Sequence, residues 1–185
     1  MPIIKKEPDV YPSDLLDSQH PLGDDSWSWY CLYTLSRREK DLMRKLMSRQ
    51  IACYCPVVAK RYRSPAGRLR TSYIPLFAGY VFMYGDESHQ YFAMTTNCIS
   101  RYQKVVDARF PEELRQIQTA LSAGVPLTAE ARLTRGQRVR VRSGHFKDFE
   151  GIVLRREGKT RLLLQLNFLE QGVSMELDEA LLTPI

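Results

Sequence analysis

The feature that most constrains this 185-residue chain is a change in its hydrophobic pattern near residue 124. After about residue 133, apolar residues stand in short alternating runs, separated by glycine-containing segments at 143–144, 158 and 171–172. Alternation with a period of two is typical of half-buried strands, because neighbouring side chains point to opposite faces. We therefore expect residues 133–185 to form a small β-barrel of about five strands.

Residues 28–123 have a mixed pattern instead. Apolar runs rich in aromatic or β-branched residues predict four strands, at 29–35, 51–59, 80–84 and 98–103. Between the second and third of these, the basic segment 60–73 predicts a hairpin that turns at Ser64–Gly67.

Three segments have the signature of helices. Ser36 and Glu39 fit a capping box, and the residues after them form an apolar stripe with a basic outer face. A short helix is predicted from Asp86 to about residue 94, and another over 111–123, between a proline and a glycine. The expected fold class is α+β, with an N-terminal α/β sandwich built on an antiparallel sheet, followed by the five-stranded barrel.

Composition predicts the tail and the linker that border the two domains, and the location of the protein. Residues 1–27 are acidic, contain proline and show no clean period, which predicts a disordered or loosely packed tail. Residues 124–132 contain glycine and proline and predict a linker between residues 28–123 and residues 133–185. No apolar run approaches the roughly 18 residues of a membrane helix, so we expect a cytoplasmic protein with no membrane partner.

The formal net charge is +6, and it is concentrated in one region. Residues 37–73 hold eleven Lys or Arg and two acidic residues, so this segment alone carries +9. Such a concentration favours a polyanionic neighbour, although charge does not distinguish DNA, RNA and an acidic protein.

Residues with catalytic or metal-binding chemistry are scattered. The four cysteines are expected to be small buried apolar residues, because Cys53 and Cys55 are too close for usual zinc-ligand spacings. The sequence also lacks a glycine-rich phosphate loop and a nucleophile with an evident histidine partner. We therefore expect no enzyme activity, no metal and no cofactor.

Two motifs resemble those of the NusG family. Residues 75–82, PLFAGYVF, are similar to the family signature PLFPGYVF, with Ala78 in place of the usual proline. Residues 136–153 resemble a KOW motif, and residues 177–183 resemble its closing strand. The resemblance covers about residues 28–185. It implies an N-terminal NusG domain, an SH3-like KOW domain and a role in transcript elongation or antitermination. The basic segment 36–50 leans toward specialised paralogues resembling RfaH.

The resemblance also implies a binding site for RNA polymerase. In the family, a pocket of aromatic residues takes the tip of the clamp helices, and five residues here are candidates: Tyr33, Phe77, Tyr80, Phe82 and Tyr102. For Phe77, a place in the core and a place in the interface remain equally open. His89 is a candidate for a second polymerase contact, but a plain position on a helix surface is favoured because Gln90 and Tyr91 depart from the family pattern.

Eight cations are candidates for nucleic-acid binding. Arg37, Arg38, Lys45 and Arg49 belong to the first predicted helix, and the resemblance implies contact with the non-template DNA strand; a solvated helix face is the alternative. Arg61, Arg63, Arg68 and Arg70 belong to the hairpin and are candidates for contact with upstream DNA.

An alternative function remains open for the whole protein, and the partner of the KOW domain also remains open. An RNA-binding structural protein of the ribosome with a KOW domain also explains the basic charge and the barrel, but not the aromatic strands. In the NusG family, the KOW domain engages partners such as ribosomal protein S10 or the termination factor Rho, and nothing in the sequence chooses between them.

Overall fold

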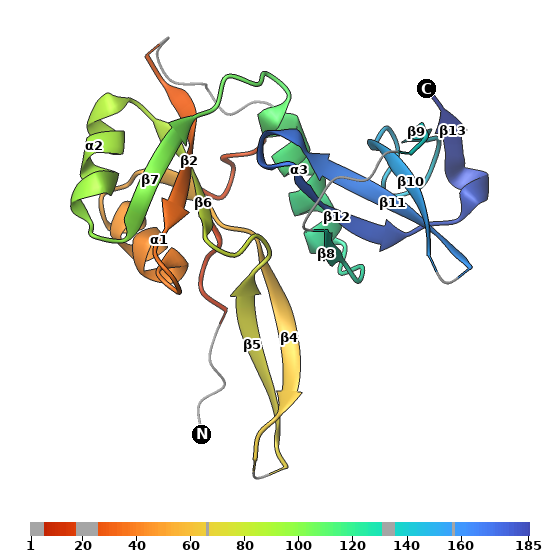
Figure 1. The fold of residues 1–185 in the computed structure, drawn as a ribbon, viewed down its shortest axis with the longest axis horizontal. Coiled ribbons are helices and arrows are strands. Elements are labelled where there is room, and N and C mark those ends of the chain that lie inside the picture. The colour runs from red at the N-terminus through yellow and green to blue at the C-terminus, as the bar shows by residue number, and fades with distance from the viewer. Residues whose placement is uncertain (1–5, 18–25, 66, 131–135, 157) are drawn as a thin grey trace. The chain divides into compact units, whose positions relative to one another are not determined.

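The computed structural model describes residues 6–17, 26–65, 67–130, 136–156 and 158–185. The chain divides into two compact units, Met1–Val106 and Asp107–Ile185. Both consist mainly of antiparallel strands with a few helices, which confirms the expected α+β class (Figure 1). No helix in the described ranges is both long and apolar enough to cross a membrane.

The first unit contains a five-stranded antiparallel sheet. Its strands, in spatial order, are β1 (Val10–Tyr11), β3 (Ala52–Tyr54), β6 (Tyr80–Gly85), β2 (Ser28–Thr34) and β7 (Ile99–Lys104). Most residues of the central strands β2 and β6 are buried, as their continuous apolar sequences predict, and Tyr33 and Tyr80 are half-buried near one end of each strand.

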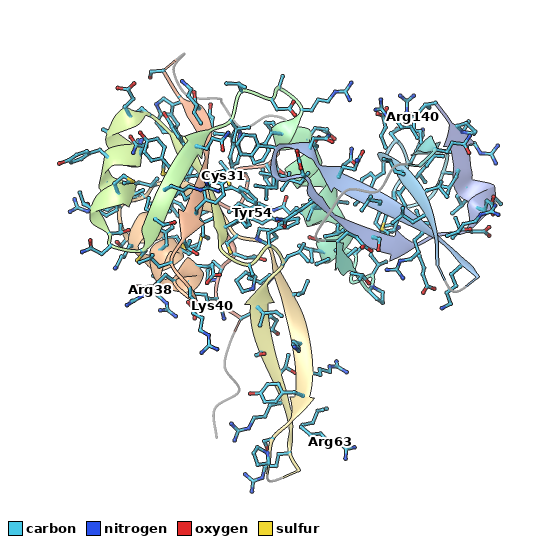
Figure 2. The ribbon with its side chains drawn as sticks, viewed as in Figure 1. Cys31, Arg38, Lys40, Tyr54, Arg63 and Arg140 are labelled. Atoms are coloured by element: carbon cyan, nitrogen blue, oxygen red, sulfur yellow. The ribbon has the colours of Figure 1, made fainter. Side chains whose placement is uncertain are left out.

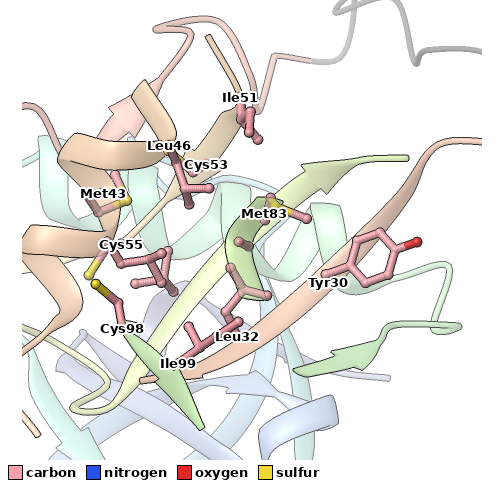
Figure 3. Packing of buried hydrophobic residues seen from close by; sticks show 13 residues of the cluster. Tyr30, Leu32, Met43, Leu46, Ile51, Cys53, Cys55, Met83, Cys98 and Ile99 are labelled. Atoms are coloured by element: carbon pink, nitrogen blue, oxygen red, sulfur yellow. The ribbon is translucent and has the colours of Figure 1, made fainter. Parts of the chain in front are cut away.

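Helices α1 (Glu39–Ser48) and α2 (Glu87–Thr95) pack on the same face of this sheet. Leu42 and Leu46 of α1 meet Leu32 and Met83 of the sheet in a hydrophobic core (Figure 3). All four side chains are fully buried. Leu42 and Leu46 are four residues apart and therefore point to the same side of the helix, toward the sheet face that carries Leu32 and Met83.

The first helix begins later than its sequence suggested. Arg38 is its N-cap, and no side-chain cap is present, so the predicted capping box of Ser36 and Glu39 does not form. The carboxylate of Glu39 instead accepts a hydrogen bond from the backbone of Gly79, 2.8 Å away. This contact with the turn before β6 joins residues 40 positions apart, and a local pattern cannot reveal it.

Strands β4 (Val57–Arg63) and β5 (Leu69–Pro75) pair only with each other among the described strands. They form a hairpin that extends away from the five-stranded sheet, with Arg63 near its tip (Figures 1 and 2). The predicted basic hairpin is therefore present.

The N-terminal segment differs from the expected loose tail. Strand β1 pairs with β3, and the backbone oxygen of Asp9 accepts a hydrogen bond from Cys55, with an N···O distance of 2.7 Å. Leu15 and Leu16 are buried. These few apolar residues were too sparse to produce a periodic pattern, yet they pack in the first unit. Residues 1–5 and 18–25 of the predicted tail lie outside the described residues.

The second unit contains helix α3 (Phe110–Ser122) and a six-stranded sheet. The sheet order is β13 (Leu182–Pro184), β9 (Arg138–Val141), β10 (Glu150–Arg156), β11 (Lys159–Leu166), β12 (Gln171–Glu176) and β8 (Thr128–Glu130). Short 3-10 helices at Asn167–Leu169 and Glu179–Leu181 connect the last strands. The expected barrel strands are present, and β8 adds one from the segment expected to be a linker.

Helix α3 packs against the barrel within the second unit. The Phe110 and Phe168 rings meet edge to face, with their centroids 5.9 Å apart. The Glu113 carboxylate accepts hydrogen bonds from the backbone and the side chain of Asn167, with a backbone N···O distance of 3.0 Å. Partial burial raises the pKa of Glu113. The division after Val106 therefore assigns α3 to the second unit, while the predicted linker at 124–132 follows this helix and stays a prediction.

Candidate protein-binding and nucleic-acid interfaces

Two of the predicted polymerase-binding aromatics are direct neighbours in the sheet. Tyr33 of β2 lies opposite Tyr80 of β6, and their rings meet edge to face with centroids 5.1 Å apart. Both side chains are half-buried. Edge-to-face geometry is favourable for aromatic pairs, and a half-buried ring keeps surface for a partner.

Phe77 and Phe82 belong to the core. Phe82 has no exposed surface, Phe77 is 2% exposed, and their ring centroids lie 6.3 Å apart. Phe82 shares a strand face with Tyr80, since side chains two apart point the same way. Its burial differs from the expected exposed position. For Phe77, the core alternative is the one that the structure favours.

Tyr102 lies on the opposite face of the sheet from Tyr33 and Tyr80. It pairs with Leu32 of β2, and its ring lies 6.3 Å from that of Tyr30, on the face covered by the helices. The five aromatics therefore do not form one cluster. Tyr102 is nevertheless 44% exposed at the edge strand β7.

Arg101 lies against the tyrosine pair, although no sequence motif pointed to it. Its guanidinium carbon lies 3.9 Å from the centroid of the Tyr33 ring, which is a cation–π contact. The Tyr33 hydroxyl donates to Gln103 at 3.3 Å. Burial raises the pKa of Tyr33, while Arg101 opposes that shift. Arg101 could have been identified from its position opposite Tyr33, but only if the register between β2 and β7 had been known.

The turn before Tyr80 is held at Gly79. The Gly79 backbone adopts a φ of 85°, which favours glycine, and its oxygen accepts a hydrogen bond from the backbone of Thr34 with an N···O distance of 2.8 Å. Gly79 therefore links the end of β2 to the start of β6. This link fixes where Tyr80 emerges from the turn.

The two arginines expected to open the first helix precede it. Arg37 has a left-handed backbone conformation with a φ of 60°, and Arg38 is the N-cap of α1. Both side chains are exposed, and Arg38 forms an ion pair with Asp41, with an N···O distance of 3.1 Å.

Lys45 is engaged within the fold and does not extend freely into solvent. Its ammonium donates to the backbone oxygen of Thr96 at 2.9 Å and to the sulfur of Cys98 at 3.3 Å. It also pairs with Asp41 at 3.3 Å. The hydrogen bond with Cys98, supported by Asp41, raises the pKa of Lys45.

Arg49, one turn later, is exposed and lies at the C-cap of α1. Its guanidinium carbon is 5.1 Å from the centroid of the Phe92 ring. Lys45 and Arg49 therefore do not form the shared solvated pair that their spacing suggested, because the ammonium of Lys45 is bonded within the fold while Arg49 is exposed.

The hairpin carries the most accessible positive charge of the predicted set. Its exposed cations are Lys60, Arg61, Arg63, Arg68 and Arg70. The segment Val57–Pro75 contains no Asp or Glu. No ion pair joins these cations to a carboxylate in the described part of the chain. They are consequently available to an external polyanion.

His89 caps helix α2. Asp86 accepts a hydrogen bond from the His89 backbone, and the imidazole Nδ1 accepts one from the Asp86 backbone with an N···N distance of 3.2 Å. The imidazole also meets the Trp27 ring edge to face, at 5.2 Å between centroids. These contacts give His89 a structural role at the helix terminus.

The described residues contain no group of three or more His, Cys, Asp or Glu that could hold a metal ion. Three cysteines, Cys31, Cys53 and Cys55, are buried, and loss of solvation raises the pKa of each thiol to about 12. A thiol with so high a pKa is a poor nucleophile or metal ligand at neutral pH.

Comparison with known proteins finds two family models in succession along the chain, the first of which extends past Val106 into α3. The family model described as transcription termination factor nusG matches residues 27–118, and the KOW motif model matches residues 135–165. No protein with a curated description matches significantly. One similar solved structure is that of the MjSpt4:Spt5 complex in conformation B. It has 14% sequence identity over 85% of this chain and 96% of that chain, and its TM-score of 0.26 is too low to carry an argument. The two matched models lie in the order that the NusG family requires, and the chain belongs to that family of transcription elongation factors.

Proposed function

We propose that this protein binds RNA polymerase through the surface around Tyr33 and Tyr80 and promotes processive elongation or antitermination. The observation that carries the proposal is the edge-to-face pair of half-buried tyrosines beside Arg101. Aromatic and arginine side chains are enriched at the anchors of protein interfaces, and an aromatic ring buries much area at a small entropic cost.

The proposed partner surface is the tip of the polymerase clamp helices, as in the NusG family. Phe77 and Phe82 support the two tyrosines from the core, since Phe82 shares their face of the sheet. Tyr102, on the other face, is then outside the anchor or at its margin. A factor that binds one polymerase conformation better than another shifts the enzyme toward that conformation.

Nucleic-acid contacts are the second part of the proposal. The hairpin arginines and the exposed cations Arg37, Arg38 and Arg49 are proposed to contact upstream or non-template DNA in the elongation complex. Contacts of this kind are charge-dominated and weaken as salt is raised. The internal bonds of Lys45 make it the weakest candidate in this group.

The proposed KOW partners are those of the family, ribosomal protein S10 or Rho. The loop between β9 and β10 presents the exposed His145 beside Phe146 and Phe149. The protein is proposed to act in the cytoplasm. The protein is also proposed to have no catalytic activity of its own.

The test is binding to core RNA polymerase followed by a run-off elongation assay. Tyr80→Ala is expected to reduce affinity about 30- to 1000-fold, the loss typical of an interface anchor. Tyr91→Ala is a matched control, because Tyr91 is a tyrosine of the same unit that is 72% exposed on α2. Equal affinity of both variants and the unaltered protein would refute the anchor. Copurification with ribosomal RNA in place of polymerase would favour the ribosomal alternative.

A further inference from the structure

The β4–β5 hairpin has two faces of different chemistry. Paired residues share a face, and one face carries Lys60 and Tyr62 from β4 with Arg70 and Ser72 from β5. Tyr62 lies directly opposite Arg70 and is 45% exposed. Lys60 is two residues from Tyr62 on the same strand, so its side chain points the same way.

An exposed tyrosine alone would mean little, because single apolar residues are common on protein surfaces. Here the ring has two cations as neighbours on its own face of the hairpin, Arg70 across the strands and Lys60 along the same strand, and the segment contains no carboxylate. Neither cation has an ion-pair partner in the described ranges. A ring with an open face among unneutralised cations combines the two elements of sites that bind single-stranded nucleic acid, a base-stacking platform and a phosphate-binding surface.

Duplex DNA fits this face less well. Its bases are stacked on one another, so it can use the cations but cannot offer a base to the Tyr62 ring without unstacking. An unpaired strand presents both its phosphates and its base faces. The exposed ring therefore discriminates between the two forms.

We propose that the hairpin face formed by Lys60, Tyr62, Arg70 and Ser72 binds an unpaired DNA strand, with one base stacked on Tyr62 and flanking phosphates at Lys60 and Arg70. This inference rests on the proposed nucleic-acid contact of the hairpin and names its ligand. In the elongation complex, the unpaired strand that meets this description is the non-template strand.

The first experiment measures binding of the full chain to a labelled mixed-sequence oligonucleotide, both single-stranded and as a duplex of equal length. Tyr62→Ile removes the ring but keeps a residue that suits a strand. It is expected to weaken single-strand binding about 5- to 150-fold and to leave duplex binding within about twofold. Tyr62→Phe retains the ring and is expected to bind as the unaltered protein does.

Salt dependence separates stacking from charge. Arg70→Gln is expected to weaken binding to both forms and to reduce the log–log salt slope for the single strand by about 0.7, the loss of one phosphate contact. Tyr62→Ile is expected to leave that slope unchanged. Tyr91→Leu, at the exposed tyrosine on α2, is the control and is expected to change neither quantity. An equal effect of Tyr62→Ile on single strand and duplex, or none on either, would overturn the proposal.

The source of the strand is tested by photo-crosslinking in an assembled elongation complex. 5-iodouracil is placed in the non-template DNA strand in one arm and its RNA counterpart, 5-iodouridine, in the transcript in the other. A crosslink that maps to Tyr62 from the DNA arm is expected. A crosslink only from the transcript would overturn the assignment to DNA. The oligonucleotide-binding measurements contain no polymerase, so their results are independent of the proposed Tyr80 anchor. If Tyr80→Ala retains polymerase affinity while Tyr62→Ile loses single-strand affinity, the proposed anchor fails and the stacking site stands.

Discussion

The Glu39 carboxylate accepts a hydrogen bond from the backbone of Gly79, with an N···O distance of 2.8 Å. Glu39 is the first residue of α1 and is 8% exposed, while Gly79 is the last residue of the turn that leads into Tyr80. This bond connects the start of the basic helix to the turn of the NusG signature. A carboxylate in the first turn of a helix is also stabilised by the helix dipole, so the position suits Glu39 in two ways.

Removal of that carboxylate is expected to destabilise the first unit. Glu39→Ala leaves the Gly79 amide without its partner, which costs about 1–3 kcal/mol of unfolding free energy. Glu39→Gln keeps an oxygen acceptor and is expected to cost less. Urea unfolding of both variants measures the difference. Equal stability of the alanine and glutamine variants would show that the bond contributes nothing.

The Lys45, Asp41 and Cys98 cluster predicts a pH dependence of stability. The Cys98 thiol donates to Asp41 at 3.4 Å, and this bond, followed by that from Lys45, lowers the pKa of Asp41 below its ordinary value of 3.8. A carboxyl with a lowered folded pKa adds stability above its ordinary pKa and loses it as the pH falls through the folded value. Lys45 has a raised pKa, so its contribution is present below its ordinary value of 10.5 and is lost at higher pH.

Asp41→Asn is therefore expected to flatten the acid limb of the stability profile. The measurement is the free energy of unfolding between about pH 2 and pH 5, where the lowered pKa of Asp41 has its effect. Asp17→Asn, at an exposed aspartate, serves as the control. An acid limb of unchanged slope in Asp41→Asn would contradict the assignment.

The buried thiols predict slow labelling of the native protein. Burial raises the pKa of Cys31, Cys53 and Cys55 to about 12, so almost no thiolate is present at pH 8, and no surface admits a reagent. Dithionitrobenzoate is expected to react with these three cysteines only after unfolding in guanidinium chloride. Rapid reaction of any of them in native buffer would mean that the sheet opens locally.

Sequence patterns predicted the elements that depend on local order. The strands that carry Tyr33 and Tyr80, the hairpin turn at Ser64–Gly67 and the short strands of the barrel follow from periodicity and turn residues. The NusG and KOW motifs predicted the family that the comparisons confirm.

Features that depend on pairing could not be predicted in the same way. Tyr33 pairs with Arg101 and Leu32 pairs with Tyr102, so Arg101 lies on the same face of the sheet as Tyr33, and Tyr102 lies on the opposite face. A shift of one residue exchanges the faces, so an alternating pattern alone could not assign them. The bonds of Lys45 to residues more than 50 positions away were equally invisible.

Close backbone approach in the barrel gives a fourth prediction. A side chain at Gly172 would place its Cβ 2.4 Å from the backbone oxygen of Leu164, on the neighbouring strand. Gly172→Ala is expected to cost about 1–3 kcal/mol or more, because the strands must separate. Gly144→Asn is the contrast. Asparagine tolerates a positive φ such as this 87° better than most other non-glycine residues, and no atom lies within 4 Å, so we expect a smaller loss of melting temperature than for Gly172→Ala. Similar melting temperatures for both variants would contradict the close approach.

Variants of Phe82 and Tyr80, on the same strand, distinguish an effect on folding stability from an effect on polymerase binding. They are two residues apart on β6 and face the same side, yet Phe82 has no exposed surface and Tyr80 is half-buried. Phe82→Ala is expected to cost about 3–5 kcal/mol of folding stability, as for a core phenylalanine. The fraction that remains folded should bind polymerase with nearly normal affinity if Phe82 only supports the surface. Tyr80→Ala should give the reverse, with a smaller loss of stability and a large loss of affinity.

Thermal melts combined with titration of core polymerase measure both quantities on the same samples. Lost affinity in a well-folded Phe82→Ala variant would place Phe82 in the interface after all, and a Tyr80→Ala variant that melts early but binds normally would remove Tyr80 from it.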